Sequence, residues 1–418
     1  MSAGVFDLAA VVIALAAVFG YVNHRWLKLP QTIGLVVIAL AASLAVIALD
    51  AAIPGLGFHA AMRSVVDRID FHETLMKGLL SFLLFAGALH VDLDDLVRRK
   101  WAIGSLATVG VLISTFLVGY ATYLVAGLVG ADIPLIWCLV FGALISPTDP
   151  VAVLSILKTL HVPETLEAKI AGESLFNDGV GVVVFTIMVA IALAGEAGGA
   201  SLSALDVVKL FLLEAVGGAV LGFAAGYIAY QAMKSIDDYV LEVLITLALV
   251  MLTYAVAIQI HVSGPIAMVV AGLLIGNHGT RFAMSETTRL HVENFWSLLD
   301  EILNAVLFLI IGFEVLTLAF SGKIALLMVI SVPVVLAARF ISVSVPLTVL
   351  GLRREFTKGA IPVLTWGGLR GGISVALALA MPETAAKPVL LAATYGVVVF
   401  SIVVQGLTLQ KVIARTVR

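Results

Sequence analysis

The sequence predicts an all-α integral membrane protein with about thirteen transmembrane helices. Hydrophobic residues make up 61% of its 418 residues and charged residues only 12%, whereas a soluble domain usually carries about 25% charged residues. The apolar residues also occur in runs of about twenty, which is the length that a helix needs to cross the hydrocarbon core of a bilayer. Membrane β-barrels instead show alternating segments of about ten residues, and this pattern is missing from the sequence.

Charged, proline-rich and glycine-rich breaks divide the chain into thirteen spans. The predicted spans are 5–22, 32–50, 74–91, 102–128, 134–157, 168–194, 206–232, 239–260, 262–276, 296–319, 323–350, 359–381 and 388–411. The ninth of these is short enough to be re-entrant. We expect 5–22 to be a span rather than a signal peptide, because it has neither a basic flank nor a small-residue cleavage site.

The positions of the basic residues support this segmentation. Of 24 lysines and arginines, sixteen fall in odd-numbered connections, at the span ends beside them or after the last span, and six fall in even-numbered connections or at the span ends beside them. The other two, Arg339 and Arg370, lie deeper inside spans. Because cytoplasmic loops carry an excess of Lys and Arg, we expect the N-terminus outside and the C-terminus in the cytoplasm. The net charge of −3 and the absence of a basic run give no indication of nucleic-acid binding.

The thirteen spans fit two inverted repeats, spans 1–6 and spans 8–13, around a linking seventh. Transporters built from such repeats place discontinuous helices at corresponding positions of the two halves. Here span 5 is interrupted at 146–150 and span 12 at 367–372, and each is the fifth span of its half. The pattern therefore predicts two discontinuous helices.

The break in span 5 reads Ser146-Pro147-Thr148-Asp149-Pro150. Proline disfavours helical geometry in the residue before it, and it removes a backbone donor. Carbonyl groups freed in this way are tolerated at membrane depth only where they line a cavity or are buried in protein. With Thr148 and Asp149 beside them, they form a set of oxygen ligands for a hard cation. The alternative is a proline kink in which Asp149 has a structural hydrogen bond.

Span 6 opens with a polar stripe. Glu173 and Asn177 are four residues apart, as are Ser174 and Asp178, so each pair shares a helix face. Carboxylates inside a membrane span are costly and indicate function by default. The alternative places 172–178 in the headgroup zone.

Arg370 is the basic residue of span 12, and a guanidinium buried there needs a partner. Glu173 is the candidate that leaves Asp149 and Asp178 for ions. The alternative is that Arg370 bonds backbone carbonyls while the glycines around it allow close packing. Two roles stay open for Arg339 in span 11. Its side chain either neutralises a carboxylate or extends to the membrane surface.

Two further features carry weaker expectations. Gly218, Gly222 and Gly226 repeat every four residues and predict a close helix contact, either within one chain or between protomers. Glu214 and Glu242 lie near span ends, where we expect them to face water.

Four segments resemble the monovalent cation/proton antiporter family that contains the bacterial NhaP-type proteins and the animal sodium/hydrogen exchangers. They are Phe-Leu-Leu-Phe-Ala-Gly-Ala-Leu at 82–89, Ser-Pro-Thr-Asp-Pro at 146–150, Gly-Glu-Ser-Leu-Phe-Asn-Asp-Gly at 172–179 and Leu-Thr-Trp-Gly-Gly-Leu-Arg-Gly-Gly at 364–372. The resemblance implies a homodimer in the plasma (bacterial inner) membrane, in contact with lipid and without a cofactor. It also implies a core domain that moves against a dimerisation domain. The core domain consists of 101–200 and 321–418. The dimerisation domain consists of 1–100 and 201–320 and includes the linking helix.

The resemblance also assigns the site. It makes Asp178 the central carboxylate that binds either ion, and it pairs Glu173 with Arg370 as a structural ion pair. The other members of the predicted Na+ site are Thr148, Asp149, Ser174 and Asn177. Asn177, where other members have a second Asp, resembles the electroneutral type. Several relatives carry Glu where this chain has Ala86, so no ligand is assigned to the third span.

The sequence therefore predicts a transporter, not an enzyme, that exchanges Na+ or Li+ for H+ one to one by alternating access, with both ions competing for Asp178. A K+/H+ antiporter on the same scaffold is the first alternative. A cation channel is the second, and the pair of discontinuous helices favours a carrier over it. A hydrolase using Ser174 is disfavoured, because the predicted spans hold no deep histidine and the sequence has no Gly-x-Ser-x-Gly elbow.

Overall fold

The computed structural model describes residues 5–53, 78–149, 153, 164–196, 203–318, 321–351 and 359–416. All regular secondary structure in these residues is helical. Eight of the described helices are long and apolar enough to cross a membrane, and Leu80–Leu89 and Leu135–Ile145 are shorter apolar helices. The predicted class, an all-α protein of many membrane spans, is confirmed.

Each of the thirteen predicted spans overlaps a helix or a pair of consecutive helices. The helices of the first half are α1 (Val5–Val22), α2 (Gln31–Ala52), α5 (Leu80–Leu89), α6 (Leu93–Arg98), α7 (Lys100–Ser105), α8 (Val111–Val129), α9 (Leu135–Ile145) and α11 (Glu164–Glu196), of which α6 lies in a connection between spans. The linking seventh span is α12 (Ala204–Lys234). The helices of the second half are α13 (Tyr239–Gln259), α14 (Gly264–Leu274), α15 (Thr280–Phe282), α16 (Glu286–Phe313), α17 (Gly322–Gly351), α18 (Ala360–Trp366), α19 (Gly372–Leu379), α20 (Lys387–Phe400) and α21 (Gly406–Thr416), of which α15 lies in a connection. Short π-helical turns are η1 (Asn23–Leu27), η3 (Leu106–Gly110), η4 (Ile275–Gly279) and η6 (Ser401–Gln405), and η5 (Glu314–Thr317) is a 3₁₀ turn.

Several helices begin at residues that cap free backbone N–H groups. Ser203 and Asp206 form a reciprocal capping box at the start of α12. Asp238 caps α13 and Ser285 caps α16 through their side-chain oxygens. Such caps satisfy donors that have no partner within the helix, so these polar residues set where the long apolar segments start.

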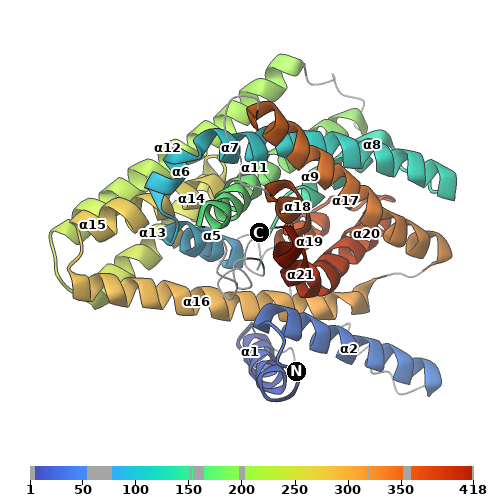
Figure 1. Cartoon of the computed structure of the whole chain (residues 1–418), viewed down its shortest axis with the longest axis horizontal. Coiled ribbons are helices and arrows are strands. Elements are labelled where there is room, and N and C mark those ends of the chain that lie inside the picture. The colour runs from blue at the N-terminus through green and yellow to red at the C-terminus, as the bar shows by residue number, and fades with distance from the viewer. Residues whose placement is uncertain are drawn as a thin grey trace.

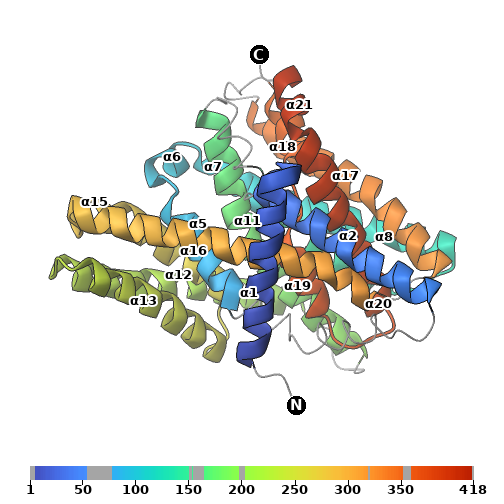
Figure 2. The same cartoon turned by 90° about the horizontal axis from the view of Figure 1, so that it is seen from below.

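The buried side chains form two large clusters joined by α16. One cluster draws on α2, α8, α9, α11, α17, α19 and α20, and the other on α5, α12, α13 and α14. Phe308 of α16 belongs to the first cluster and Trp296 to the second. Figure 1 shows α16 running beneath both groups of helices, and Figure 2 shows α1 and α2 crossing it from below. The division into a core and a dimerisation domain stays a prediction.

The glycine repeat of α12 faces α14 of the same chain. A Cβ atom on Gly218 would lie 2.5 Å from the Ser263 carbonyl oxygen, and one on Gly222 would lie 2.2 Å from the Ala267 carbonyl oxygen. A Cβ on Gly226 would lie 3.3 Å from the Cα of Ala271. The close contact predicted from this repeat is therefore within the protomer.

Glu242 does not face water as expected. It lies in the first turn of α13 and is fully buried, with 0% of its surface exposed. A carboxylate there is favoured by the partial positive charge of the helix N-terminus. The position of Glu242 near a span end did not indicate this interaction. Glu214 of α12 is half-buried.

We expect Gly222→Ala to destabilise the protein, because the added methyl group would collide with backbone atoms of α14 that cannot move aside as a side chain can. Overpacking of this kind costs about 1–3 kcal/mol. Thermal unfolding of the purified protein in detergent measures the effect. Gly127→Ala is the control, since a Cβ atom there meets nothing within 4 Å. Equal melting temperatures for the two variants would contradict the close contact.

Candidate functional site

Both predicted helix breaks are present in the structure. α9 ends at Ile145 and residues 146–149 are not helical, while α18 ends at Trp366 and α19 starts at Gly372. The two breaks occupy the fifth span of each half, as the sequence predicts. The continuation of span 5 after Asp149 lies outside the described residues, apart from Val153.

The two breaks are bonded to each other. The backbone N–H of Asp149 donates to the Leu369 carbonyl over 2.8 Å, and Nη1 of Arg370 donates to the Pro147 carbonyl over 3.1 Å. A Cβ atom on Gly371 would lie only 2.0 Å from an Asp149 carboxylate oxygen, so glycine is required for this approach. One carbonyl group of each break, at Pro147 and at Leu369, thus finds its partner in the other break, as burial in a membrane protein requires.

α11 contributes the next layer of polar groups. The amide oxygen of Asn177 accepts the Thr148 N–H over 3.2 Å, and its Nδ2 donates to the Thr148 hydroxyl over 2.8 Å. The hydroxyl groups of Thr148 and Ser174 are 3.0 Å apart. All three residues are at most 3% exposed. The structure therefore brings together Thr148, which follows α9, with Ser174 and Asn177 of α11.

Asp178 lies beside this group with an oxygen that has no partner. It is 4% exposed, and its Oδ1 makes no hydrogen bond among the described residues. Asp149 and Arg370 are both close enough to influence its charge. Buried polar atoms are nearly always hydrogen-bonded, so an unsatisfied one calls for an explanation.

The predicted pair between Glu173 and Arg370 is corrected by the structure. Glu173 forms its ion pair with Arg339 of α17, with 2.5 Å between Oε1 and Nη1. Nε and Nη2 of Arg339 also donate to the Leu364 carbonyl at the end of α18. Arg339 therefore neutralises a carboxylate, which was one of its two open roles. Residue spacing could not show which of the two intramembrane arginines pairs with Glu173, because the pairing depends on how α17 packs against α11.

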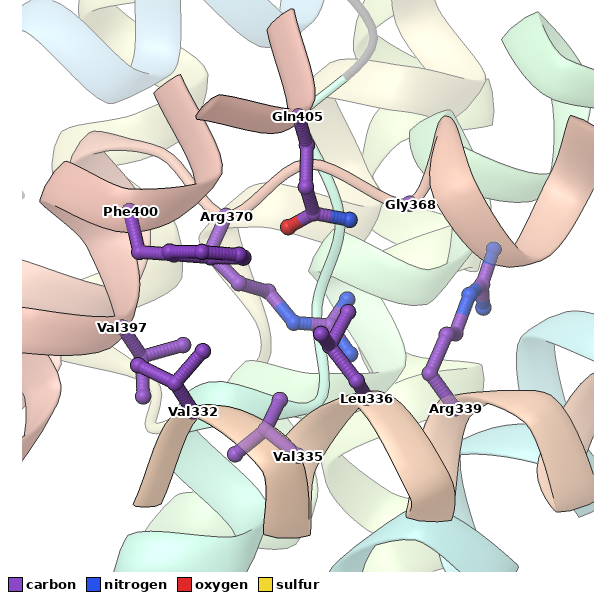
Figure 3. A pocket seen from close by; sticks show the side chains of 9 residues that line it. All are labelled: Val332, Val335, Leu336, Arg339, Gly368, Arg370, Val397, Phe400 and Gln405. Atoms are coloured by element: carbon purple, nitrogen blue, oxygen red, sulfur yellow. The ribbon is translucent and has the colours of Figure 1, made fainter. Parts of the chain in front are cut away.

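Arg370 instead follows the alternative in which it bonds a backbone carbonyl. Its side chain is 2% exposed, and Nε and Nη2 make no hydrogen bond among the described residues. Figure 3 shows the guanidinium beside a small cavity. Its lining residues are Val332, Val335, Leu336, Arg339, Gly368, Arg370, Val397, Phe400 and Gln405. The cavity has room for about one water molecule.

Three residues that touch the span 12 break, Arg339, Ser401 and Gln405, received no site role in the sequence analysis. Arg339 is 6% exposed, Ser401 0% and Gln405 3%. The available signal was the presence of polar side chains within apolar spans, which are costly unless they are paired. The signal does not say which partner each side chain has.

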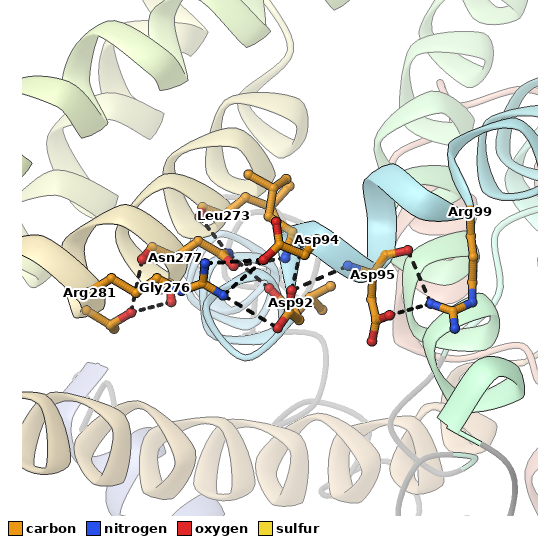
Figure 4. Close-up of polar contacts among 11 residues, drawn as sticks. Asp92, Asp94, Asp95, Arg99, Leu273, Gly276, Asn277 and Arg281 are labelled. Atoms are coloured by element: carbon orange, nitrogen blue, oxygen red, sulfur yellow. Dashed lines mark hydrogen bonds and ion pairs between the residues drawn. The ribbon is translucent and has the colours of Figure 1, made fainter.

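A second polar cluster connects η4 with the turn between α5 and α6 (Figure 4). Asn277 accepts the Leu93 N–H over 2.8 Å and donates to the Val91 carbonyl over 3.0 Å. Arg281 forms an exposed ion pair with Asp94 at 3.2 Å. These contacts hold the C-terminal end of α5, the helix that carries the buried Ala86.

We expect Arg339→Leu to lower the free energy of unfolding by about 3–5 kcal/mol, because it leaves the Glu173 carboxylate buried without its counter-charge. Arg281→Gln, which removes an exposed Arg–Asp pair, is the matched control and should cost under about 1 kcal/mol. The measurement is thermal or denaturant unfolding in detergent. A double variant, Glu173→Gln with Arg339→Gln, should lose less than the sum of the two single changes. Strict additivity would argue against a direct pair.

Comparison with known proteins identifies the family of this chain. The transmembrane sodium/hydrogen exchanger family model matches residues 13–415. The chain is 49% identical over 416 residues to the Na(+)/H(+) antiporter NhaP of Pseudomonas aeruginosa, covering 98% of this chain and 96% of that protein. It is 36% identical over 393 residues to the Na(+)/H(+) antiporter NhaH of Halobacillus dabanensis, covering 94% and 93%. The solved structure of the sodium proton antiporter MjNhaP1 from Methanocaldococcus jannaschii has the same fold, with a TM-score of 0.74 at 17% identity over 98% of this chain and 97% of that one. This multi-pass membrane protein belongs to the sodium/hydrogen exchanger family.

Proposed function

We propose that this protein is a secondary active transporter that exchanges Na+, or Li+ in its place, for H+ at a single site centred on Asp178. The observation that carries the proposal is the buried carboxylate oxygen of Asp178, which has no hydrogen-bond partner in the part of the chain that the structure describes and lies beside two broken helices. Two similar proteins are named Na(+)/H(+) antiporters, and this supports the choice of ions.

The proposed mechanism is competition for one carboxylate. Asp178 carries either a proton or a dehydrated cation, because each neutralises the same negative charge. Moving a bare charge through a low-dielectric barrier is expensive, so only the occupied site crosses between inward-facing and outward-facing states. Entry of one ion then requires departure of the other, which makes exchange obligatory.

The remaining site residues have different tasks. Both hydrogen-bonding ends of the Asn177 amide are engaged with Thr148, so Asn177 holds Thr148 in place. The Ser174 hydroxyl lies against the Thr148 hydroxyl, and Asp149 adds a second carboxylate near Asp178. Hydroxyl and carboxylate oxygens are the ligands that hard cations prefer. Thr148, Asp149 and Ser174 therefore complete the cation site in this proposal.

The surrounding charges favour one-to-one exchange. Glu173 is already neutralised by Arg339, and Asn177 adds no second titrating group to α11. One proton leaves Asp178 for each monovalent cation that binds, so the cycle moves no net charge. The alternating movement would occur between the core domain, 101–200 with 321–418, and the dimerisation domain of a homodimer. We place the protein in the bacterial inner membrane with its N-terminus outside.

Asp178→Asn should abolish cation-driven proton movement, because an amide can neither release a proton nor neutralise a cation. The assay uses purified protein in proteoliposomes with an internal pH-sensitive dye and pulses of Na+, Li+ or K+. Asp206→Asn is the control, since Asp206 is an exposed capping carboxylate at the start of α12. Full activity in Asp178→Asn would refute the assignment, and a response to K+ alone would favour a K+/H+ antiporter.

The rate of exchange should be the same with and without an imposed membrane potential. The physical reason is that a one-to-one cycle of like charges moves no net charge through the field. The measurement compares initial rates of proton movement in vesicles with valinomycin and either equal or tenfold different K+ concentrations across the bilayer. A rate that changes with potential would show unequal stoichiometry, and a sustained Na+ current without proton coupling would show a channel.

A further inference from the structure

The break in span 12 exposes backbone groups that need partners inside the protein. A helix that stops leaves its last carbonyl groups without helical donors, and hydrocarbon offers no replacement. Arg339 donates to the Leu364 carbonyl, and the Asp149 N–H donates to the Leu369 carbonyl. These contacts come from span 11 and span 5, and they leave the stretch between Leu364 and Arg370 only partly accounted for.

Span 13 supplies the remaining partners through two side chains. Nε2 of Gln405 donates to the Trp366 carbonyl over 3.0 Å. The Ser401 hydroxyl oxygen accepts the backbone N–H of Arg370 over 3.0 Å. The Ser401 hydroxyl in turn donates to Oε1 of Gln405 over 2.7 Å. The two side chains form one continuous hydrogen-bonded link that reaches both sides of the Gly367-Gly368 bend.

The local structure of span 13 is shaped around this link. Ser401 and Gln405 are the first and last residues of the π-helical turn η6, in which the Gly406 N–H bonds the Ser401 carbonyl. A π turn inserts one residue into a helix and is frequently found at functional sites. Figure 3 shows Gln405 extending from this turn toward Arg370 and Gly368. Both side chains are buried, where an unpaired amide or hydroxyl would be costly.

We propose that Ser401 and Gln405 are positioning residues for cation binding. They hold the span 12 backbone at Trp366 and Arg370, and Arg370 then holds the Pro147 carbonyl, which directly precedes Thr148. This inference rests on the proposed function and adds two residues of span 13 to its site. Neither side chain touches the transported ion, so their effect passes through Arg370 and the span 5 break.

The expected effect is on affinity for the cation. Without the link, the Arg370 backbone loses its acceptor, and the guanidinium no longer fixes the Pro147–Thr148 segment. Removing one such hydrogen bond should raise the apparent KM for Na+ roughly 3- to 10-fold, with the maximal rate within about twofold of the unmodified protein. A residue that served helix packing alone would lower the amount or stability of folded protein and leave the KM unchanged.

The variants Ser401→Ala, Gln405→Leu and the double variant test the proposal in proteoliposomes, with rates normalised to folded protein. Thr394→Val is the control, because the Thr394 hydroxyl is equally buried on the same span and, among the described residues, bonds only the Leu390 carbonyl of its own helix. Both single variants should raise the KM, and the control should not. Because the two residues act through one link, the KM for Na+ should rise in the double variant by less than the product of the increases in the two single variants.

Hydrogen–deuterium exchange of the peptide covering 364–372 provides a readout that needs no transport. Amide exchange in this peptide should be at least roughly fivefold faster in Ser401→Ala than in Thr394→Val, because the Arg370 N–H loses its acceptor. Unchanged exchange together with an unchanged KM for Na+ in both single variants would overturn the inference. If the unmodified protein moved no protons with any cation, the proposed function would fail, and exchange at this peptide would still decide whether the link holds the break.

Discussion

The backbone of two interrupted helices must be satisfied inside the protein, and the rest of the site depends on how this is done. Hydrocarbon cannot hydrogen-bond the groups that a break releases. Here the breaks satisfy each other through the bonds from Asp149 to Leu369 and from Arg370 to Pro147. This mutual bonding fixes Thr148 and Asp149 against α11, so the requirement of backbone pairing also assembles the candidate ion site.

The distribution of buried charge selects the carboxylate that is available for ions. Glu173 is neutralised by Arg339, which also closes the end of α18 by bonding the Leu364 carbonyl. Asp178, one helical turn further along α11, keeps an oxygen without a hydrogen-bond partner among the described residues. One carboxylate of α11 therefore serves the fold, and Asp178 is the carboxylate that we propose for ion exchange. Residues of span 13 take part as well, through the link from Gln405 and Ser401 to the span 12 break.

Much of this arrangement could be predicted from local sequence because the bilayer imposes simple rules. Long apolar runs and the asymmetry of Lys and Arg located the spans, and prolines or glycines within a span located the breaks. The contact among Thr148, Ser174 and Asn177 could be expected because these polar residues are concentrated in two short segments, and their role as an ion site stays a prediction. The predicted pairing of Glu173 with Arg370 and the predicted exposure of Glu242 were wrong, since the partner of one side chain and the burial of the other depend on which helices lie alongside. A polar residue at a span end can face water or another helix, and the local sequence is the same in both cases.

By itself, the sequence determined that this is a helical membrane protein with two broken spans and a polar stripe on span 6. These properties follow from hydropathy, the geometry of proline and glycine, and residue spacing, all of which act over a few neighbouring residues. The tertiary structure alone decided that Arg339 pairs with Glu173, that Arg370 bonds the Pro147 carbonyl, and that Ser401 and Gln405 support the span 12 break. Those contacts join residues from 31 to 223 positions apart, and a hydrogen bond over such a separation is specified by helix packing rather than by local sequence.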